Sequence, residues 1–176
     1  MGILSKKLCM VGDFGVGKTS LIRRFVERQF SDRYLSTVGV KISRKTMTIA
    51  DSERGTQDLK LLIWDIEGQT KFKAIAPSYL QGASGILAVA DLTRQETVEH
   101  LADHIRNFLA INQHGFIAVA LNKADLIDRE ELAQIRNLLE QPSEQVIGVY
   151  QTSAKTGESV DTIFEHLTKR IWTKGN

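Results

Sequence analysis

The chain has 176 residues, 42% of them hydrophobic and 25% charged, so it is long enough to bury one full hydrophobic core. Its formal net charge is +2 at pH 7 and no block of Lys and Arg stands out, so the composition gives no indication of nucleic-acid binding. No apolar run approaches the roughly 20 residues of a membrane-spanning helix. The one cysteine, Cys9, lies in an apolar stretch and is predicted to be a core residue.

Apolar runs and helical patterns alternate along the chain. Strands are predicted at residues 6–12, 38–50, 58–65, 85–90, 116–121 and 146–150, and helices at 18–28, 94–111 and 128–140. A last helix is indicated by the apolar stripe Val160, Ile163, Phe164, Leu167 and Ile171. The polar segment D-S-E-R-G-T-Q between the second and third strands predicts a hairpin. This alternation favours a doubly wound α/β sheet in a single domain spanning residues 1–176.

The first strand is followed by G-D-F-G-V-G-K-T at residues 12–19, which matches the pattern G-x-x-x-x-G-K-[ST] between a strand and a helix. Glycines let the backbone N–H groups converge on phosphate oxygens, and the helix N-terminus favours an anion. Lys18 would place its charge at the β- and γ-phosphates, and Thr19 would offer a hydroxyl to Mg²⁺. The loop does not identify the base, because ATP-dependent P-loop kinases share it.

Two later segments identify the base as guanine. N-K-A-D at 122–125 and T-S-A-K at 152–155 each follow a predicted strand. The Asp125 carboxylate can accept hydrogen bonds from the ring N–H and the exocyclic amine of guanine, which adenine does not present there. Asn122 can tie the loops together, the Lys123 stem can lie over the ring, and the Ala154 N–H can donate to the guanine carbonyl. An ATP-dependent kinase is therefore disfavoured, and no Arg-rich lid segment is apparent.

Further segments carry a resemblance to a known family. With the loops above, Y-L-S-T-V-G-V at 34–40, D-I-E-G-Q-T at 65–70 and S-Y-L-Q-G-A-S-G at 78–85 resemble small GTPases of the Ras superfamily, Rab branch, over about residues 5–172. The resemblance implies a P-loop GTPase fold: a six-stranded, mostly parallel sheet with one antiparallel strand and about five helices. It also implies a switch that binds GTP or GDP with Mg²⁺ and hydrolyses GTP slowly without an activating protein.

The resemblance further implies the roles of individual residues. Phe30 would stack on guanine, and the Gly68 N–H would contact the γ-phosphate. Gln69 and Lys18 would be the catalytic residues, with Gln69 orienting the attacking water and Lys18 placing its charge at the phosphates. The implied metal-site residues are Thr19, Thr37 and Asp65. The full implied nucleotide-binding set is Gly15, Val16, Gly17, Lys18, Thr19, Ser20, Phe30, Tyr34, Thr37, Gly68, Asn122, Lys123, Asp125, Ser153, Ala154 and Lys155.

Partners and location follow from the same resemblance. Effectors, exchange factors and activating proteins would read the two switch regions, at about 31–42 and 65–80, in a membrane-trafficking role. Trp64 and Tyr79 match two members of the aromatic triad that Rab effectors read, while Ile42 stands where Phe is common; packing of the strand pair is the alternative role for Trp64. We expect a cytoplasmic monomer that meets a membrane only through a lipid anchor or partner supplied outside this chain.

Four residues depart from the family patterns: Ile66, Glu67 and Thr70 replace Thr, Ala and Glu of D-T-A-G-Q-E, and Phe14 replaces a small phosphate-loop residue. Glu67 and Phe14 matter most for function. Glu67 replaces Ala: its carboxylate either faces solvent or pairs with Lys71 or Lys73, or else it faces inward and perturbs phosphate or Mg²⁺ binding. Phe14 would lie near Gln69 and near the entry of a trans-acting arginine, or would swing over the surface. Both keep open an alternative function, a guanine-nucleotide-binding scaffold with impaired hydrolysis.

A histidine pair also stands out. His100 and His104 lie four residues apart on a predicted helix, a spacing that can hold a metal ion. The segment H-L-A-D-H lacks the glutamate of H-E-x-x-H. We therefore predict that this pair lies on an exposed helix face.

Overall fold

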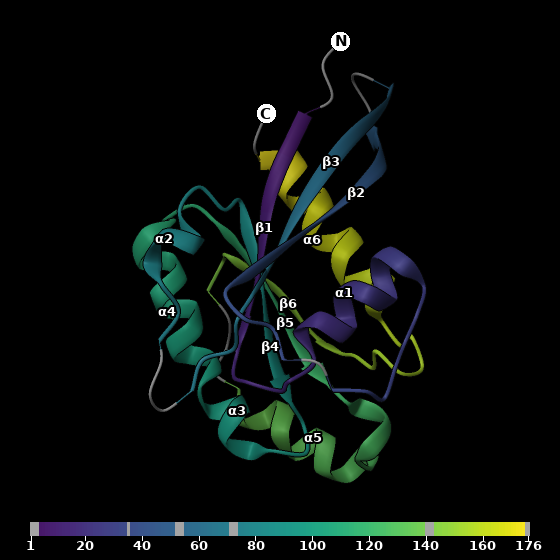
Figure 1. Cartoon of the computed structure of the whole chain (residues 1–176), viewed down its shortest axis with the longest axis vertical. Helices are drawn as coiled ribbons and strands as arrows, with labels where there is room; N and C mark the ends of the chain where they lie inside the picture. The colour runs from purple at the N-terminus through teal and green to yellow at the C-terminus, as the bar shows by residue number, and fades with distance from the viewer. Residues whose placement is uncertain (1–3, 35, 52–54, 71–73, 140–142, 175–176) are drawn as a thin grey trace.

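The computed structural model describes residues 4–34, 36–51, 55–70, 74–139 and 143–174 (Figure 1). All the predicted strands and helices are present in the predicted order, and the structure adds the short elements α2 and η1. The elements are β1 (Leu4–Gly12), α1 (Lys18–Glu27), β2 (Val40–Asp51), β3 (Gly55–Ile66), α2 (Pro77–Leu80), β4 (Gly85–Asp91), α3 (Gln95–Glu99), α4 (Leu101–Ile111), β5 (Phe116–Asn122), a 3-10 turn η1 (Ala124–Leu126), α5 (Arg129–Leu138), β6 (Val146–Gln151) and α6 (Val160–Lys174).

The strands form one six-stranded sheet in the order β2-β3-β1-β4-β5-β6. Within the described ranges β2 and β3 make the antiparallel pair, with Val40 opposite Ile66 and Asp51 opposite Gly55, and the other neighbours are parallel. The predicted sheet is therefore confirmed. Residues 52–54 of the predicted hairpin loop lie outside the described residues.

Helices cover both faces of the sheet (Figure 1). On one face α1 and α6 pack over the sheet, with α6 lying on β5 and β6, and the other face is covered by α2, α3, α4 and α5. Only His100 separates α3 from α4, so together they occupy the single helical stretch predicted at 94–111. Counted in this way, the described α-helices agree with the expected number of about five.

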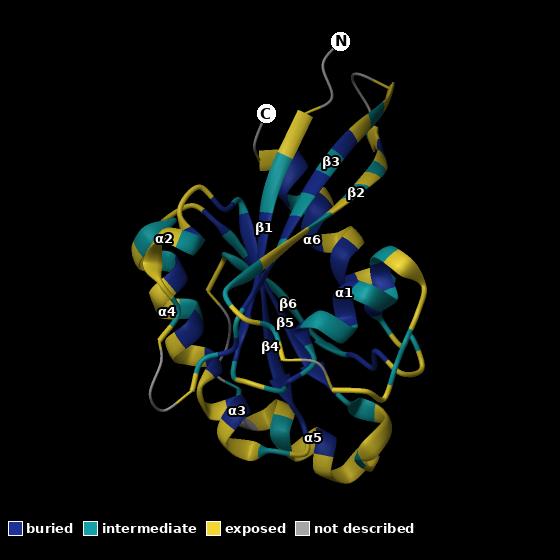
Figure 2. Cartoon of the chain, in the orientation of Figure 1, coloured by how far each residue is buried: buried dark blue, intermediate teal, exposed yellow. Residues whose placement is uncertain are grey.

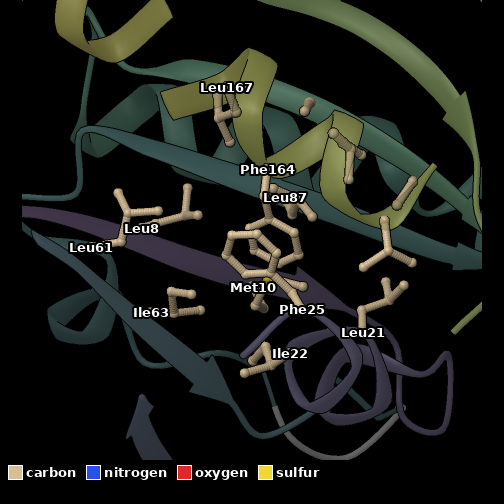
Figure 3. Packing of buried hydrophobic residues seen from close by; sticks show 14 of the residues in the cluster. Leu8, Met10, Leu21, Ile22, Phe25, Leu61, Ile63, Leu87, Phe164 and Leu167 are labelled. Atoms are coloured by element: carbon tan, nitrogen blue, oxygen red, sulfur yellow. The ribbon is translucent and has the colours of Figure 1, made fainter. Parts of the chain in front are cut away.

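The core follows the hydrophobic pattern of the sequence. All residues of β4 are buried, as expected for a central strand with helices on both faces (Figure 2). Between α1 and the sheet, the rings of Phe25 and Phe164 stack with centroids 4.1 Å apart and an angle of 2° between their planes (Figure 3). Phe164 belongs to the predicted stripe of α6, whose five members are all buried.

Cys9 confirms its prediction as a core residue. The thiol is fully buried in β1, and burial raises its pKa to about 12, so it stays protonated at neutral pH. Among the described residues no helix has the length and apolar character needed to cross a bilayer.

The stacked aromatic pair provides a test of the core. Replacing Phe164 with Ala removes a fully buried ring and leaves a cavity, so we expect a loss of about 3–5 kcal/mol in the free energy of unfolding. Urea denaturation followed by circular dichroism measures this loss. Val38→Ala serves as control, because Val38 is 81% exposed and its truncation should change stability by about 0.5 kcal/mol or less. Equal losses in the two variants would contradict the packing described.

Candidate functional site

Four polar loops meet at the edge of the sheet where the parallel strands β1, β4, β5 and β6 end (Figure 1). Open α/β sheets bind ligands at such an edge, since loops from neighbouring strands converge there. The described residues enclose a cleft of about 400 Å³ at this edge. Its walls include most of the predicted nucleotide-binding residues: Gly15, Gly17, Lys18, Thr19, Ser20, Phe30, Tyr34, Thr37, Gly68, Asn122, Lys123, Asp125, Ala154 and Lys155.

The remaining predicted residues do not line the cleft. Val16, Asp65 and Ser153 are buried, and Gln69 is half-buried. Gln69 forms a parallel bridge with Asp13: its N–H donates to the Gly12 carbonyl at 3.2 Å, and its carbonyl accepts from the Phe14 N–H at 3.0 Å. The second switch is therefore attached by its backbone to the loop after β1.

Two glycines allow this close packing. Gly17 has φ 102°, and a Cβ there would lie 2.3 Å from Asn122 Nδ2, which itself donates to the Val16 carbonyl at 2.9 Å. A Cβ on Gly68 would lie 2.5 Å from the Phe14 Cα. Any side chain at either position would push the loops apart, so both positions require glycine.

Lys18 carries a buried positive charge at the floor of the cleft. It is 6% exposed, and its Nζ donates to the carbonyls of Gly12 at 3.0 Å and Asp13 at 2.8 Å. Burial lowers the pKa of this ammonium to about 8, with Asp65 and Asp13 acting in the opposite direction. A buried ammonium has three N–H donors and is stabilised by a nearby anion. The position therefore suits a bound phosphate.

Thr19, Thr37 and Asp65 place three side-chain oxygens close together beside Lys18. Thr19 Oγ1 lies 2.6 Å from Asp65 Oδ2 and 2.8 Å from Thr37 Oγ1. Burial raises the pKa of Asp65. Its Oδ1 is buried and has no hydrogen-bond partner among the described residues. Hydroxyl and carboxylate oxygens are the ligands that Mg²⁺ prefers, and an orphaned carboxylate oxygen can accept a hydrogen bond from metal-bound water. These residues fit the Mg²⁺ that the family resemblance implies.

The two base-recognition segments are linked to each other. Ser153 Oγ donates to Asp125 Oδ1 at 2.6 Å, which fixes the carboxylate proposed to read the base. The Ala124 N–H donates to the Thr152 carbonyl at 3.0 Å, and Thr152 Oγ1 donates to Asn122 Oδ1 at 3.2 Å. The ends of β5 and β6 therefore hold N-K-A-D and T-S-A-K as one rigid unit.

Lys123 stretches across the cleft. Its Nζ donates to the Gly15 carbonyl at 3.2 Å and to Asp91 Oδ2 at 2.6 Å. Burial alone would raise the pKa of Asp91, but hydrogen bonds from Lys123 and Thr93 hold this pKa below its ordinary value. The ammonium is thus anchored at the loop after β1, and the apolar stem of Lys123 spans the gap between the base loops and the phosphate loop.

Two residues that contact the cleft loops were not predicted: Asp91, the last residue of β4, and Arg94, three residues later. Arg94 Nη2 donates to the Phe14 carbonyl at 2.7 Å, and its Nε contacts Asp91 Oδ2 at 3.2 Å. The available signal was positional: Asp91 is the first polar residue after a fully apolar run, at the carboxyl end of a central strand. Nothing in the sequence alone pointed to Arg94.

The prediction of an exposed histidine pair is confirmed for His100, which is exposed, and is wrong for His104, which is buried. His104 is 2% exposed, and its Nε2 lies 2.9 Å from Asp13 Oδ1, while His100 Nδ1 lies 2.6 Å from Asp13 Oδ2. The helix turns this face toward the loop after β1, whose Asp13 carboxylate bridges the two rings. The described residues contain no group of three or more His, Cys, Asp or Glu side chains arranged to hold a metal ion.

Phe14 lies where the phosphate loop meets the first switch. It is 41% exposed, and its ring contacts the Tyr34 ring edge-on, with centroids 5.3 Å apart. Its backbone is held by Gln69 and Arg94. The Phe14 backbone is therefore bonded to Gln69, while its exposed ring packs against Tyr34 of the first switch.

Comparison with known proteins agrees with this geometry. The model of the Ras family matches residues 7–173 of the chain. Ras-related protein Rab-22A of Homo sapiens is 33% identical over 175 residues, covering 97% of this chain and 86% of that protein. Ras-related protein RABF2a of Arabidopsis thaliana is 35% identical over 170 residues, covering 96% and 82%. Ras-related protein Rab-10 of Caenorhabditis elegans is 34% identical over 169 residues, covering 96% and 81%.

The contact between Asp13 and His100 predicts a pH-dependent contribution to stability. The hydrogen bond with Asp13 raises the pKa of His100, so the folded state binds a proton more tightly than the unfolded state. This contribution is present at low pH and is lost as pH rises through the raised pKa. We expect His100→Ala to lose more stability at about pH 5.5 than at about pH 8.5. Burial lowers the pKa of His104, but His104 is present in both the original protein and His100→Ala, so its contribution cancels in the comparison.

Urea unfolding at the two pH values measures this difference, with the exposed His114→Ala as control. A loss of the same size at both pH values would show that His100 gains no proton affinity on folding.

Proposed function

Because the chain belongs to the Ras family of small GTPases and is similar to Rab proteins over nearly its whole length, we propose that it is a Rab-type molecular switch. In this role it binds GTP and GDP with Mg²⁺ and hydrolyses GTP slowly on its own. The observation that carries the proposal is the shared cleft, whose walls combine the phosphate loop, the base loops and the first switch. We further propose that residues 1–176 act as one G domain.

The proposed chemistry assigns a task to each wall of the cleft. Lys18 binds the β- and γ-phosphates, and the Gly68 N–H contacts the γ-phosphate. Mg²⁺, when bound at Thr19, Thr37 and Asp65, neutralises phosphate charge. Gln69 orients the attacking water; its backbone bonds to the phosphate loop support this role, since they fix its distance from the phosphate cradle.

Switching would depend on Thr37 and Gly68. Both line the cleft, and they belong to the two proposed switch regions, 31–42 and 65–80. Loss of the γ-phosphate removes a shared contact, so both segments relax and a bound effector loses its surface. We propose effectors, exchange factors and activating proteins as partners, and a cytoplasmic monomer that acts in membrane trafficking.

The proposed effector surface includes the end of the β2–β3 pair. Ile42 lies directly opposite Trp64 in the ladder, and Ile42 is 39% exposed. Trp64 is half-buried, and the Lys7 ammonium lies 3.7 Å from the centre of its ring. The contact with Lys7 supports a structural role for Trp64. The exposed side chain of Ile42 beside it offers partners an apolar contact, so Trp64 can also contribute to the effector surface.

An alternative function is a guanine-nucleotide-binding scaffold with impaired hydrolysis. The contact of Phe14 with Tyr34 favours it, because both residues line the cleft and the Phe14 backbone is bonded to Gln69. An activating protein that inserts an arginine there would have to displace an aromatic pair. Hydrolysis measurements separate the two functions.

Base selectivity tests the guanine assignment. We expect purified protein to bind GDP and GTP in preference to ATP. Asp125→Ala should weaken GDP binding by about 30-fold or more, since loss of two hydrogen bonds to the base costs at least about 2 kcal/mol. Fluorescent-nucleotide titration measures the affinities. Asp103→Ala, at an exposed position of α4, should leave them unchanged. Binding of ATP as tight as that of GDP would overturn the assignment.

Single-turnover hydrolysis tests the enzymatic proposal. We expect a rate on the order of 10⁻³ s⁻¹ or below for GTP-loaded protein, the range of unassisted small GTPases. A rate near 1 s⁻¹ would contradict this expectation. Gln69→Ala should lower the rate if Gln69 orients water, and an unchanged rate would favour the scaffold. With an activating protein, faster hydrolysis in Phe14→Gly than in the original protein would show that the aromatic pair blocks assistance.

A further inference from the structure

Glu67 contacts the first switch directly. The antiparallel ladder between β2 and β3 ends with Val40 opposite Ile66, so Gly39 and Glu67 occupy the next position. The Glu67 N–H donates to the Gly39 carbonyl at 2.8 Å. In return the Gly39 N–H donates to the Glu67 carboxylate, at 2.9 Å from Oε2. Lys71 and Lys73, considered as its partners on sequence grounds, lie outside the described residues.

This exchange departs from an ordinary ladder. In a hydrogen-bonded antiparallel pair each residue donates and accepts through its backbone. Here the side chain of Glu67 replaces its own carbonyl as the acceptor for Gly39. An alanine, as in D-T-A-G-Q-E, has no acceptor to offer, so the bond exists because this position is occupied by a glutamate.

The path of the chain after β3 explains why a side chain is needed. Beyond Glu67 the backbone leaves β2 and joins the phosphate loop, where Gln69 pairs with Asp13 and Gly68 packs against the Phe14 backbone. The Glu67 carboxylate extends the β2–β3 contact across the point where the two backbones diverge.

The contact joins both proposed switches through protein atoms. Gly39 lies two residues after Thr37, and Glu67 lies between Asp65 and Gly68. Donor and acceptor both belong to the chain, so neither bond requires a γ-phosphate. A carboxylate acceptor makes the bond from Gly39 stronger than a neutral one.

We propose that Glu67 is a positioning residue that holds the first switch against the second switch in both nucleotide states. The inference rests on the proposed function as a guanine-nucleotide switch and concerns how that switch is biased. The tether favours the closed arrangement before the γ-phosphate contributes, so GTP binds a conformation that is already populated. An effector that reads residues near Gly39 then discriminates less between the GDP and GTP forms.

Amide hydrogen exchange of Gly39 in the GDP-bound protein tests the tether directly. We expect Glu67→Ala to speed this exchange by about tenfold or more, while Glu67→Gln keeps most of the protection because an amide oxygen still accepts. Amides of α6 report global stability in the same spectra and should stay unchanged. Glu165→Ala, at an exposed position of α6, is the matched control. Unchanged Gly39 exchange in Glu67→Ala would overturn the proposal.

The ratio of GTP affinity to GDP affinity is a second test, because the two explanations of Glu67 change this ratio in opposite directions. If Glu67 tethers the first switch, Glu67→Ala weakens GTP binding more than GDP binding, by several-fold, and Glu67→Gln restores the ratio. A carboxylate that repels phosphate would give the opposite sign, with GTP gaining on GDP in both variants. That result, or an unchanged ratio, would show that the contact of Glu67 with Gly39 does not favour the closed arrangement of the switches.

The two readouts separate this inference from the proposed function. A protein that binds neither GDP nor GTP would refute the switch function. The exchange of Gly39 could still be compared among the same three proteins, and it would report the Glu67 contact alone.

Discussion

The buried ammonium of Lys18 is the constraint on which the rest of the site depends. A charge taken out of water must be compensated by dipoles or opposite charges, and here the carbonyls of Gly12 and Asp13 provide the dipoles. Those carbonyls point at Lys18 only while the loop after β1 keeps its tight path. That path requires glycine at position 17, where Asn122 packs directly against the backbone.

Contacts from neighbouring loops hold the same loop from outside. His100 and His104 hydrogen-bond the Asp13 carboxylate. Arg94 donates to the Phe14 carbonyl, and Lys123 donates to the Gly15 carbonyl. Three of these four side chains come from the segment that follows β4, so the shape of the phosphate loop depends on α3 and α4 as well as on its own glycines. A displacement of α3 or α4 would therefore shift the phosphate loop through the side chains of Arg94, His100 and His104.

The two switch segments are linked to each other where Thr37 meets Asp65 and where Gly39 meets Glu67. The backbone of Gln69 then attaches the second switch to the phosphate loop. The contact of Gly39 with Glu67 lies, along the chain, between Asp65 and Gln69. A negative charge at Glu67 does not help to bind phosphate. Its carboxylate is instead the acceptor for the Gly39 N–H, because the backbones of β2 and β3 diverge there and leave that N–H in need of an acceptor.

The sequence by itself predicted the architecture and most of the residues that line the cleft. Strand and helix periods fixed the order of the elements, and the three spaced segments at 12–19, 122–125 and 152–155 predicted which loops would meet, since parallel strands end at a common edge. Only the tertiary structure decided the partners of side chains whose contacts lie far apart in the chain. His104 looked like a surface residue because helical spacing does not say which face turns inward, and Arg94 carried no local signal. The acceptor for Gly39 depended on where two strands diverge, which is a property of the packed sheet and not of any segment within it.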